Sequence, residues 1–169
     1  MRSRISLTVA AAFLSLLAGC GEEDTPVTTS ATESSWILTD EPEGAVSIVQ
    51  AKSDAKEGDR ITLRGRIGGR KAPLSGESAV FTIIDMELPH CGQMGDEDHC
   101  PTPWDYCCET PEDLRANAAT VQLVGDGGGA IDPIAGGLEA LDEVVVVGTV
   151  GPRPSEEVLT IRATRVYKK

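Results

Sequence analysis

The sequence predicts a mainly β domain folded as a small, closed or nearly closed barrel. Several short segments alternate apolar and polar residues with a period of two, or are rich in β-branched residues, and both patterns are typical of strands. Glycine-rich turns separate these segments, and no helical pattern between them is long. Short strands with glycine-rich corners favour a barrel, with a β-sandwich as the alternative.

A short helix is expected before the first strand. Ser47 at the N-cap and Gln50 three residues later match a capping box. The helix is predicted to run to about Lys56, because Gly58 is a good residue for terminating it. The folded domain is therefore expected to begin near Ala45.

Five strands are predicted along the chain. In the first, Ile61, Leu63 and Ile67 alternate with polar residues, so one face of this strand is expected to be buried. In the last, the alternation fails at Arg165 and Val166, which predicts a bulge or a sheet edge at that point. The five segments are residues 59–67, 79–86, 120–124, 143–150 and 159–167.

Two more helical segments are expected between the strands. Thr110 as N-cap and Pro111 at the first helical position predict a brief helix that ends at about Asn117. Residues 134–141 are expected to contain one short helical turn.

The N-terminus has the parts of an export signal. Arg2 and Arg4 precede an uncharged, mostly apolar run at residues 5–17, which is shorter than the roughly 20 apolar residues needed to span a bilayer. The next residues, Leu17-Ala18-Gly19-Cys20, resemble the bacterial lipobox. This resemblance implies a signal peptide at residues 1–19 and lipid attachment to Cys20.

The lipobox resemblance also implies a location and a domain organisation. We expect an exported protein, anchored by its lipid to the cell envelope, at the outer membrane and facing the periplasm. An acidic, Thr-rich segment follows Cys20, so residues 20–44 are predicted to be a flexible tether, with Trp36-Ile37-Leu38 as a first anchor on the domain at 45–169. The net charge of −12 argues against nucleic-acid binding. The expected partners are the membrane, through the lipid, and an envelope protein or small ligand.

Three of the predicted strand segments resemble bacterial OB-fold domains. They are residues 58–67, 81–85 and 144–150, and the resemblance covers about residues 45–168. It implies a five-stranded OB-like barrel with a short N-terminal helix. Residues 87–118 then form a Cys/His-rich insertion between the second and third strands of the barrel.

The insertion contains most of the residues that could carry chemistry. Residues 89–108 hold four of the five cysteines and both histidines of the chain. Within them, residues 100–108 resemble a C-P-T-P-W-D-x-C-C segment found in bacterial lipoproteins with OB-like domains. That resemblance supports the fold and implies no activity.

Disulfide bonds are the favoured interpretation of these cysteines. An exported chain lies in an oxidising compartment, and four cysteines remain after lipidation of the fifth. Adjacent cysteines rarely bond to each other. Cys91 and Cys100 are therefore each expected to pair with Cys107 or Cys108, which requires no cofactor.

A zinc or copper site is the alternative interpretation. Thiolate and imidazole groups are common ligands of both metals, although the spacing lacks the C-x2-C of zinc knuckles. The candidate ligands are His90, Cys91, His99, Cys100, Cys107 and Cys108. A second alternative, a thiol–disulfide redox protein, is disfavoured because the chain has no C-x-x-C motif.

No catalytic motif such as G-x-S-x-G or H-E-x-x-H occurs in the sequence. We therefore expect a protein that is not an enzyme. The predicted function is that of a lipid-anchored envelope domain that binds an unknown ligand and carries a disulfide-stapled loop. A metal-binding lipoprotein and a redox protein are the alternatives.

Overall fold

The computed structural model describes residues 36–93 and 100–169. No helix in these two ranges is both long and apolar enough to cross a membrane. The predicted signal peptide, the lipobox with Cys20, the first part of the tether and His99 lie outside the described residues.

In chain order the elements, with 3₁₀ turns labelled η, are β1 (Ile37–Leu38), α1 (Ile48–Asp54), β2 (Arg60–Ile67), β3 (Val80–Ile84), η1 (Cys91–Gln93), η2 (Pro103–Asp105), α2 (Pro111–Asn117), β4 (Ala118–Leu123), η3 (Ile134–Gly136), β5 (Glu143–Val150) and β6 (Thr160–Lys168).

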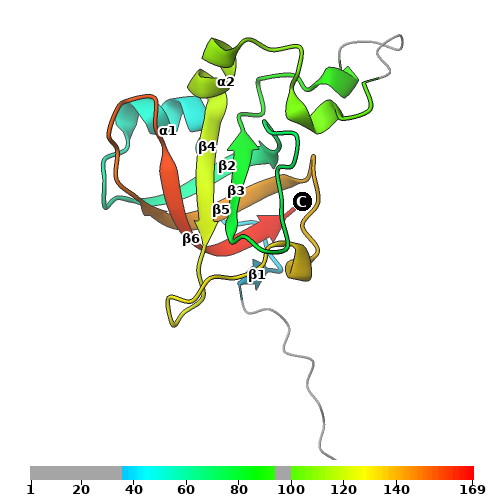
Figure 1. Ribbon diagram of the computed structural model, residues 1–169. Helices are drawn as coiled ribbons and strands as arrows, with labels where there is room; N and C mark the ends of the chain where they lie inside the picture. The colour runs from blue at the N-terminus through cyan, green and yellow to red at the C-terminus, as the bar shows by residue number, and fades with distance from the viewer. Residues whose placement is uncertain (1–35, 94–99) are drawn as a thin grey trace, which may run out of the picture. The chain divides into compact units, whose positions relative to one another are not determined.

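Five of these strands form a closed barrel (Figure 1). β2 pairs antiparallel with β3 and with β5, β3 pairs antiparallel with β4, and β5 pairs antiparallel with β6. The parallel pairing of β4 with β6 closes the ring. The predicted five-stranded, OB-like barrel is therefore confirmed, and each strand begins and ends within two residues of its predicted bounds.

The barrel interior is filled by the apolar residues that the alternating pattern places on one face of each strand. In β2, for example, Leu63 and Ile67 are fully buried, whereas Thr62 and Arg64, the neighbours of Leu63, are partly exposed. Burial of this kind of surface is the main favourable contribution to folding. The buried strand residues of the core are Leu63, Ile67, Phe81, Ile83, Ala119, Val121, Leu123, Val144, Val146, Val150, Ile161, Ala163 and Val166.

β6 contains the irregularity predicted from the failed alternation. Arg165 is opposite Val147 on β5, but Ala163 is opposite the next residue of β5, Gly148. Thr164 is therefore the extra residue of a β-bulge. A bulge shifts the phase of inward and outward side chains by one residue, which explains why the period of two fails at this point in the sequence.

The chain joins the barrel earlier than the predicted boundary near Ala45. Trp36 is 5% exposed and belongs to the core, and its carbonyl accepts a hydrogen bond of 2.8 Å from the backbone N–H of Val166. β1 follows it directly and pairs in parallel with β6. Because an indole ring removes a large apolar area from water when buried, the suggested anchor at residues 36–38 is part of the fold rather than of a free tether.

The two helices begin at the predicted caps. The Ser47 hydroxyl accepts a hydrogen bond from the Gln50 backbone N–H at 3.1 Å, and α1 ends at Asp54, two residues before its predicted end. The Thr110 hydroxyl accepts the same kind of bond from the Asp113 backbone N–H, also at 3.1 Å. α2 has the predicted bounds. Each cap satisfies a backbone donor that would otherwise have no partner inside its helix.

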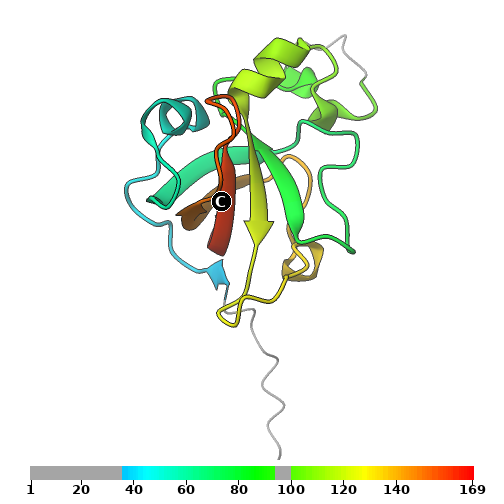
Figure 2. The ribbon, with the colours of Figure 1, turned by 60° about the vertical axis from the view of Figure 1, so that its left-hand side comes forward.

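The insertion lies between β3 and β4, as predicted. Figures 1 and 2 both show η1, η2 and α2 at the end of the barrel where β3 ends and β4 begins. Asp85, directly after β3, is 1% exposed. Its carboxylate accepts hydrogen bonds from the backbone N–H of Val49 in α1 (3.0 Å) and of Glu87 (3.1 Å). This buried carboxylate therefore ties the start of the insertion to α1.

Candidate metal centre

The insertion is attached to the loop that follows β2. The Gly69 backbone N–H donates a 2.8 Å hydrogen bond to the Trp104 carbonyl, and the Trp104 indole N–H donates one of 3.1 Å to the Lys71 carbonyl. Tyr106 is fully buried and has a left-handed backbone conformation with φ of 56°. A Cβ on Gly68 would lie 2.7 Å from the Trp104 carbonyl oxygen and 2.8 Å from Tyr106 Cε2. Glycine at position 68 therefore permits the close approach that holds the insertion in place.

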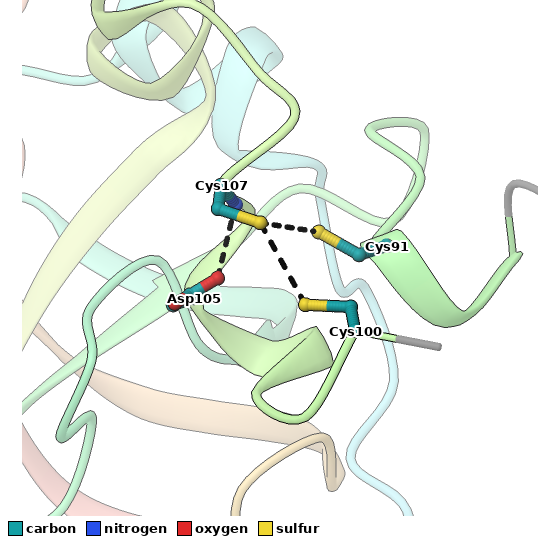
Figure 3. Close-up of side chains that lie close together, drawn as sticks. All are labelled: Cys91, Cys100, Asp105 and Cys107. Carbon is teal, nitrogen blue, oxygen red and sulfur yellow. Dashed lines mark hydrogen bonds between the residues drawn. The ribbon is translucent and has the colours of Figure 1, made fainter. Parts of the chain in front are cut away.

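This attachment brings together four side chains that could hold a metal ion. The sulfurs of Cys91, Cys100 and Cys107 and a carboxylate oxygen of Asp105 all lie within 4.8 Å of one another (Figure 3). We call these four residues the thiol cluster. Cys91 begins η1, Cys100 precedes the Pro101-Thr102-Pro103 segment, and Asp105 and Cys107 flank Tyr106 at the end of η2.

The four described cysteines are not joined by disulfide bonds. Cys91, Cys100 and Cys107 are thiols, and no described cysteine has a sulfur at bonding distance. The sulfurs of Cys91 and Cys107 are 3.4 Å apart, whereas a disulfide bond is about 2.05 Å long. The favoured expectation of two bridges is therefore not met in this structure, in which the sulfurs converge on a common centre instead of pairing.

The distances between the sulfurs suit tetrahedral metal coordination. Zinc–thiolate bonds of about 2.3 Å at tetrahedral angles separate two sulfurs by about 3.8 Å. The Cys107 sulfur lies 3.4 Å from that of Cys91 and 3.6 Å from that of Cys100. Both separations are a few tenths of an ångström below the tetrahedral value. Small side-chain movements are therefore enough to seat an ion among the three sulfurs.

Asp105 is a member of the thiol cluster that the sequence did not reveal as a ligand. Its Oδ1 accepts a hydrogen bond of 3.0 Å from the Cys107 backbone N–H, and its Oδ2 accepts one of 2.8 Å from the Thr102 hydroxyl. A carboxylate has about four lone-pair sites, so these bonds leave capacity for a metal. Carboxylates that bind metals are commonly held by such hydrogen bonds. The spacing Thr102-x-x-Asp105-x-Cys107 is the sequence signal that could have indicated this role.

The thiols of the cluster differ in acidity. Burial acts to raise the pKa of the Cys91 thiol, but hydrogen bonds from the Cys108 backbone N–H and from the Cys107, Cys108 and Cys100 thiols together lower that pKa overall. The pKa of Cys107 is raised, first by its hydrogen bond to Cys91 and then by its hydrogen bond to Cys100. Of these two thiols, Cys91 is therefore the more acidic in the metal-free protein.

Two of the six predicted ligands lie outside the thiol cluster. The His90 imidazole Nδ1 accepts a hydrogen bond from the Gly92 backbone N–H at 3.2 Å, and the ring packs edge-on against Tyr106. Burial, followed by the positive charge of Arg66, lowers the pKa of His90. The Cys108 sulfur is 4.0 Å from that of Cys107 but is not within 4.8 Å of every ligand atom in the group. The structure thus unites Cys91, Cys100 and Cys107 from the predicted set and adds Asp105.

No protein-family model matches this chain, and no curated protein or solved structure is detectably similar to it. The geometry of the thiol cluster is therefore the observation that bears most directly on function. Three thiols and a carboxylate lie together at the end of the barrel, in a group that could hold a metal ion.

Proposed function

We propose that this protein binds one thiophilic metal ion, zinc or Cu(I), through Cys91, Cys100, Cys107 and Asp105. The single observation that carries this proposal is the convergence of these four side chains within 4.8 Å of one another. Thiolates are the preferred protein ligands of Cu(I), and zinc is commonly held by cysteines in a tetrahedron. Three sulfurs and one carboxylate supply the four positions that a tetrahedral zinc ion requires.

Hydrogen bonding around the thiol cluster favours metal binding over a structural disulfide. The Cys91 sulfur accepts a hydrogen bond from the Cys108 backbone N–H, and such a bond stabilises a thiolate rather than a disulfide sulfur. Within the thiol cluster, a single disulfide would also involve only two of the three sulfurs. A metal ion uses all three at once.

The attachment of the insertion supports a site of defined geometry. Tyr106, between the two ligands Asp105 and Cys107, is fully buried, and Trp104 is hydrogen-bonded to the loop that follows β2. Ligands supported by buried neighbours are held close to one arrangement before the ion binds. Bound metal would in turn link Cys91, Cys100 and Cys107 to one another.

Metal content of the reduced protein tests the proposal. The chain should be purified with a reductant, incubated with zinc or Cu(I), passed through a desalting column and analysed for metal. We expect one ion per chain, and loss of that ion in the Cys91→Ser and Cys100→Ser variants. Cys108→Ser is the matched control, because it removes a thiol outside the thiol cluster and keeps a hydroxyl that can still donate a hydrogen bond to the Cys91 sulfur. Absence of stoichiometric metal from the reduced chain would overturn the proposal.

We also propose that the metal site is carried by an exported, lipid-anchored protein. The support is the sequence alone: two arginines, an apolar run and Leu17-Ala18-Gly19-Cys20. In bacteria that express the full chain, the wild-type protein should sediment with membranes, and the Cys20→Ser variant should not be lipidated. A Cys20→Ser protein that is processed normally and still fractionates with membranes would contradict lipid anchoring. Binding of an envelope ligand by the barrel stays a prediction of the sequence.

A further inference from the structure

One sulfur is central to the whole group of thiols. The Cys107 sulfur lies 3.4 Å from that of Cys91, 3.6 Å from that of Cys100 and 4.0 Å from that of Cys108. Cys107 is also exposed to solvent, whereas Cys91 is 1% exposed. The same sulfur is therefore both a candidate metal ligand and a thiol that solution oxidants can reach.

We infer that the proposed metal site is controlled by oxidation, because a disulfide between Cys107 and Cys91 would exclude the metal. This inference rests on the proposed function. The metal-bound state and the disulfide-bonded state use the same sulfur atoms. A sulfur in a disulfide bond is no longer a thiolate, and the thiolate is the form of cysteine that ligates metals. Oxidation would leave one sulfur and one carboxylate of the thiol cluster, which is too few protein ligands for a stable tetrahedral site.

The reaction requires an oxidant, for which a low-molecular-weight disulfide is the chemical class. Cys107, which is deprotonated when it serves as a metal ligand, attacks one sulfur of that disulfide as a thiolate; the S–S bond breaks, and one small thiolate leaves. The Cys91 thiolate then attacks the Cys107 sulfur of the mixed disulfide, and the second small thiolate leaves. Two electrons pass from the two cysteines to the oxidant, and the metal departs without a change in its own oxidation state.

The arrangement of Cys91 makes it the expected partner in the second step. Its sulfur is the nearest to that of Cys107, and forming a bond of about 2.05 Å from 3.4 Å requires a closure of only about 1.4 Å. Its hydrogen bond from the Cys108 backbone N–H keeps the sulfur in place beside Cys107. The buried Cys91 is poorly accessible to the oxidant itself, so Cys107 reacts first and Cys91 second.

Oxidation of the zinc-loaded full-length protein with oxidised glutathione tests this inference. Zinc release would be followed with a colorimetric chelator, free thiols would be counted in parallel, and the bridge would be located by peptide mass spectrometry. We expect one zinc ion released for each two cluster thiols lost, with Cys91 linked to Cys107. Reduction followed by added zinc should restore the original metal content.

The Cys108→Ser variant is the matched control, since it removes the thiol adjacent in sequence to Cys107, leaves both reacting sulfurs in place and keeps a hydroxyl that can donate a hydrogen bond to Cys91. It should release zinc in the same proportion to thiols lost. Retention of zinc while the thiols are consumed, or a bridge from Cys107 to Cys100 or Cys108, would overturn the inference. Neither result would refute the proposed metal binding by the reduced protein. Failure of the reduced protein to bind zinc at all would instead refute the proposed function.

Discussion

At the scale of single residues, the chemistry of the site depends on how each ligand is held. Cys91 is buried and receives a backbone hydrogen bond, whereas Cys107 is exposed and is aligned by the bond from its own N–H to Asp105. Asp105 therefore serves two purposes in the proposed site. It orients Cys107, and it supplies the fourth ligand.

The role of Asp105 can be tested with Asp105→Asn. The amide keeps one acceptor oxygen but loses the negative charge and half of the acceptor capacity, so the affinity for zinc should fall about 10- to 100-fold, as for other residues that support metal ligands. Competition with a chelator of known affinity measures this change. The Cys108→Ser variant should bind with nearly wild-type affinity. Equal affinities of Asp105→Asn and the wild type would exclude Asp105 from the site.

The affinity for zinc should depend on pH through the same thiols. Protons and zinc compete for each sulfur, and the raised pKa of Cys107 means that this sulfur holds its proton strongly in the metal-free protein. Affinity is therefore predicted to rise as pH increases from 6 to 8, with release of protons on binding. Isothermal titration calorimetry in buffers of different ionisation enthalpy measures that release. Binding without proton release would show that the thiols are not the ligands.

At the scale of elements, the insertion is held by contacts to the barrel rather than by its own secondary structure. Around the thiol cluster, η1 and η2 are single 3₁₀ turns, and this part of the insertion is fixed through Tyr106, Trp104 and the loop that follows β2. Removing one of these contacts should disturb the site without altering any ligand.

Gly68→Ala is the substitution that tests this attachment. The new methyl group would lie 2.7 Å from the Trp104 carbonyl oxygen, so the insertion must shift, at a cost of about 1–3 kcal/mol in the free energy of unfolding. We expect a lower midpoint of thermal unfolding and weaker zinc binding. Gly127→Ala is the control, because a Cβ there meets no atom within 4 Å. Similar effects of the two substitutions would contradict a specific role for the contact at Gly68.

At the scale of the whole molecule, the barrel could be predicted from sequence and the thiol cluster could not. The strands were recognisable because the alternation of apolar and polar residues along a strand follows the burial of its two faces. The alternation fails at Arg165 and Val166, directly after Thr164, the extra residue of the bulge. The cluster depends on how the insertion packs on the barrel, which the spacing of cysteines does not encode. The place of Asp105 in the thiol cluster and that of Trp36 in the core were not predicted for the same reason, since tertiary contacts determine both.

Metal binding should also raise the stability of the whole domain, because zinc binds the folded state and not the unfolded one. At a free zinc concentration 100-fold above the dissociation constant, the gain in the free energy of unfolding is about 2.7 kcal/mol. Thermal unfolding of the reduced protein with zinc and with excess chelator measures it. The Cys100→Ser variant should show no difference between the two conditions. A wild-type midpoint that zinc does not raise would contradict binding to the folded state.

X-ray absorption spectroscopy at the zinc edge can identify the ligands of the proposed site, because it reports which atoms surround the ion. For the reduced, zinc-loaded protein we predict three sulfurs at about 2.3 Å and one oxygen at about 2.0–2.2 Å. Coordination of zinc by nitrogen and oxygen atoms without sulfur would contradict the proposed metal site, since Cys91, Cys100 and Cys107 would then not share one ion.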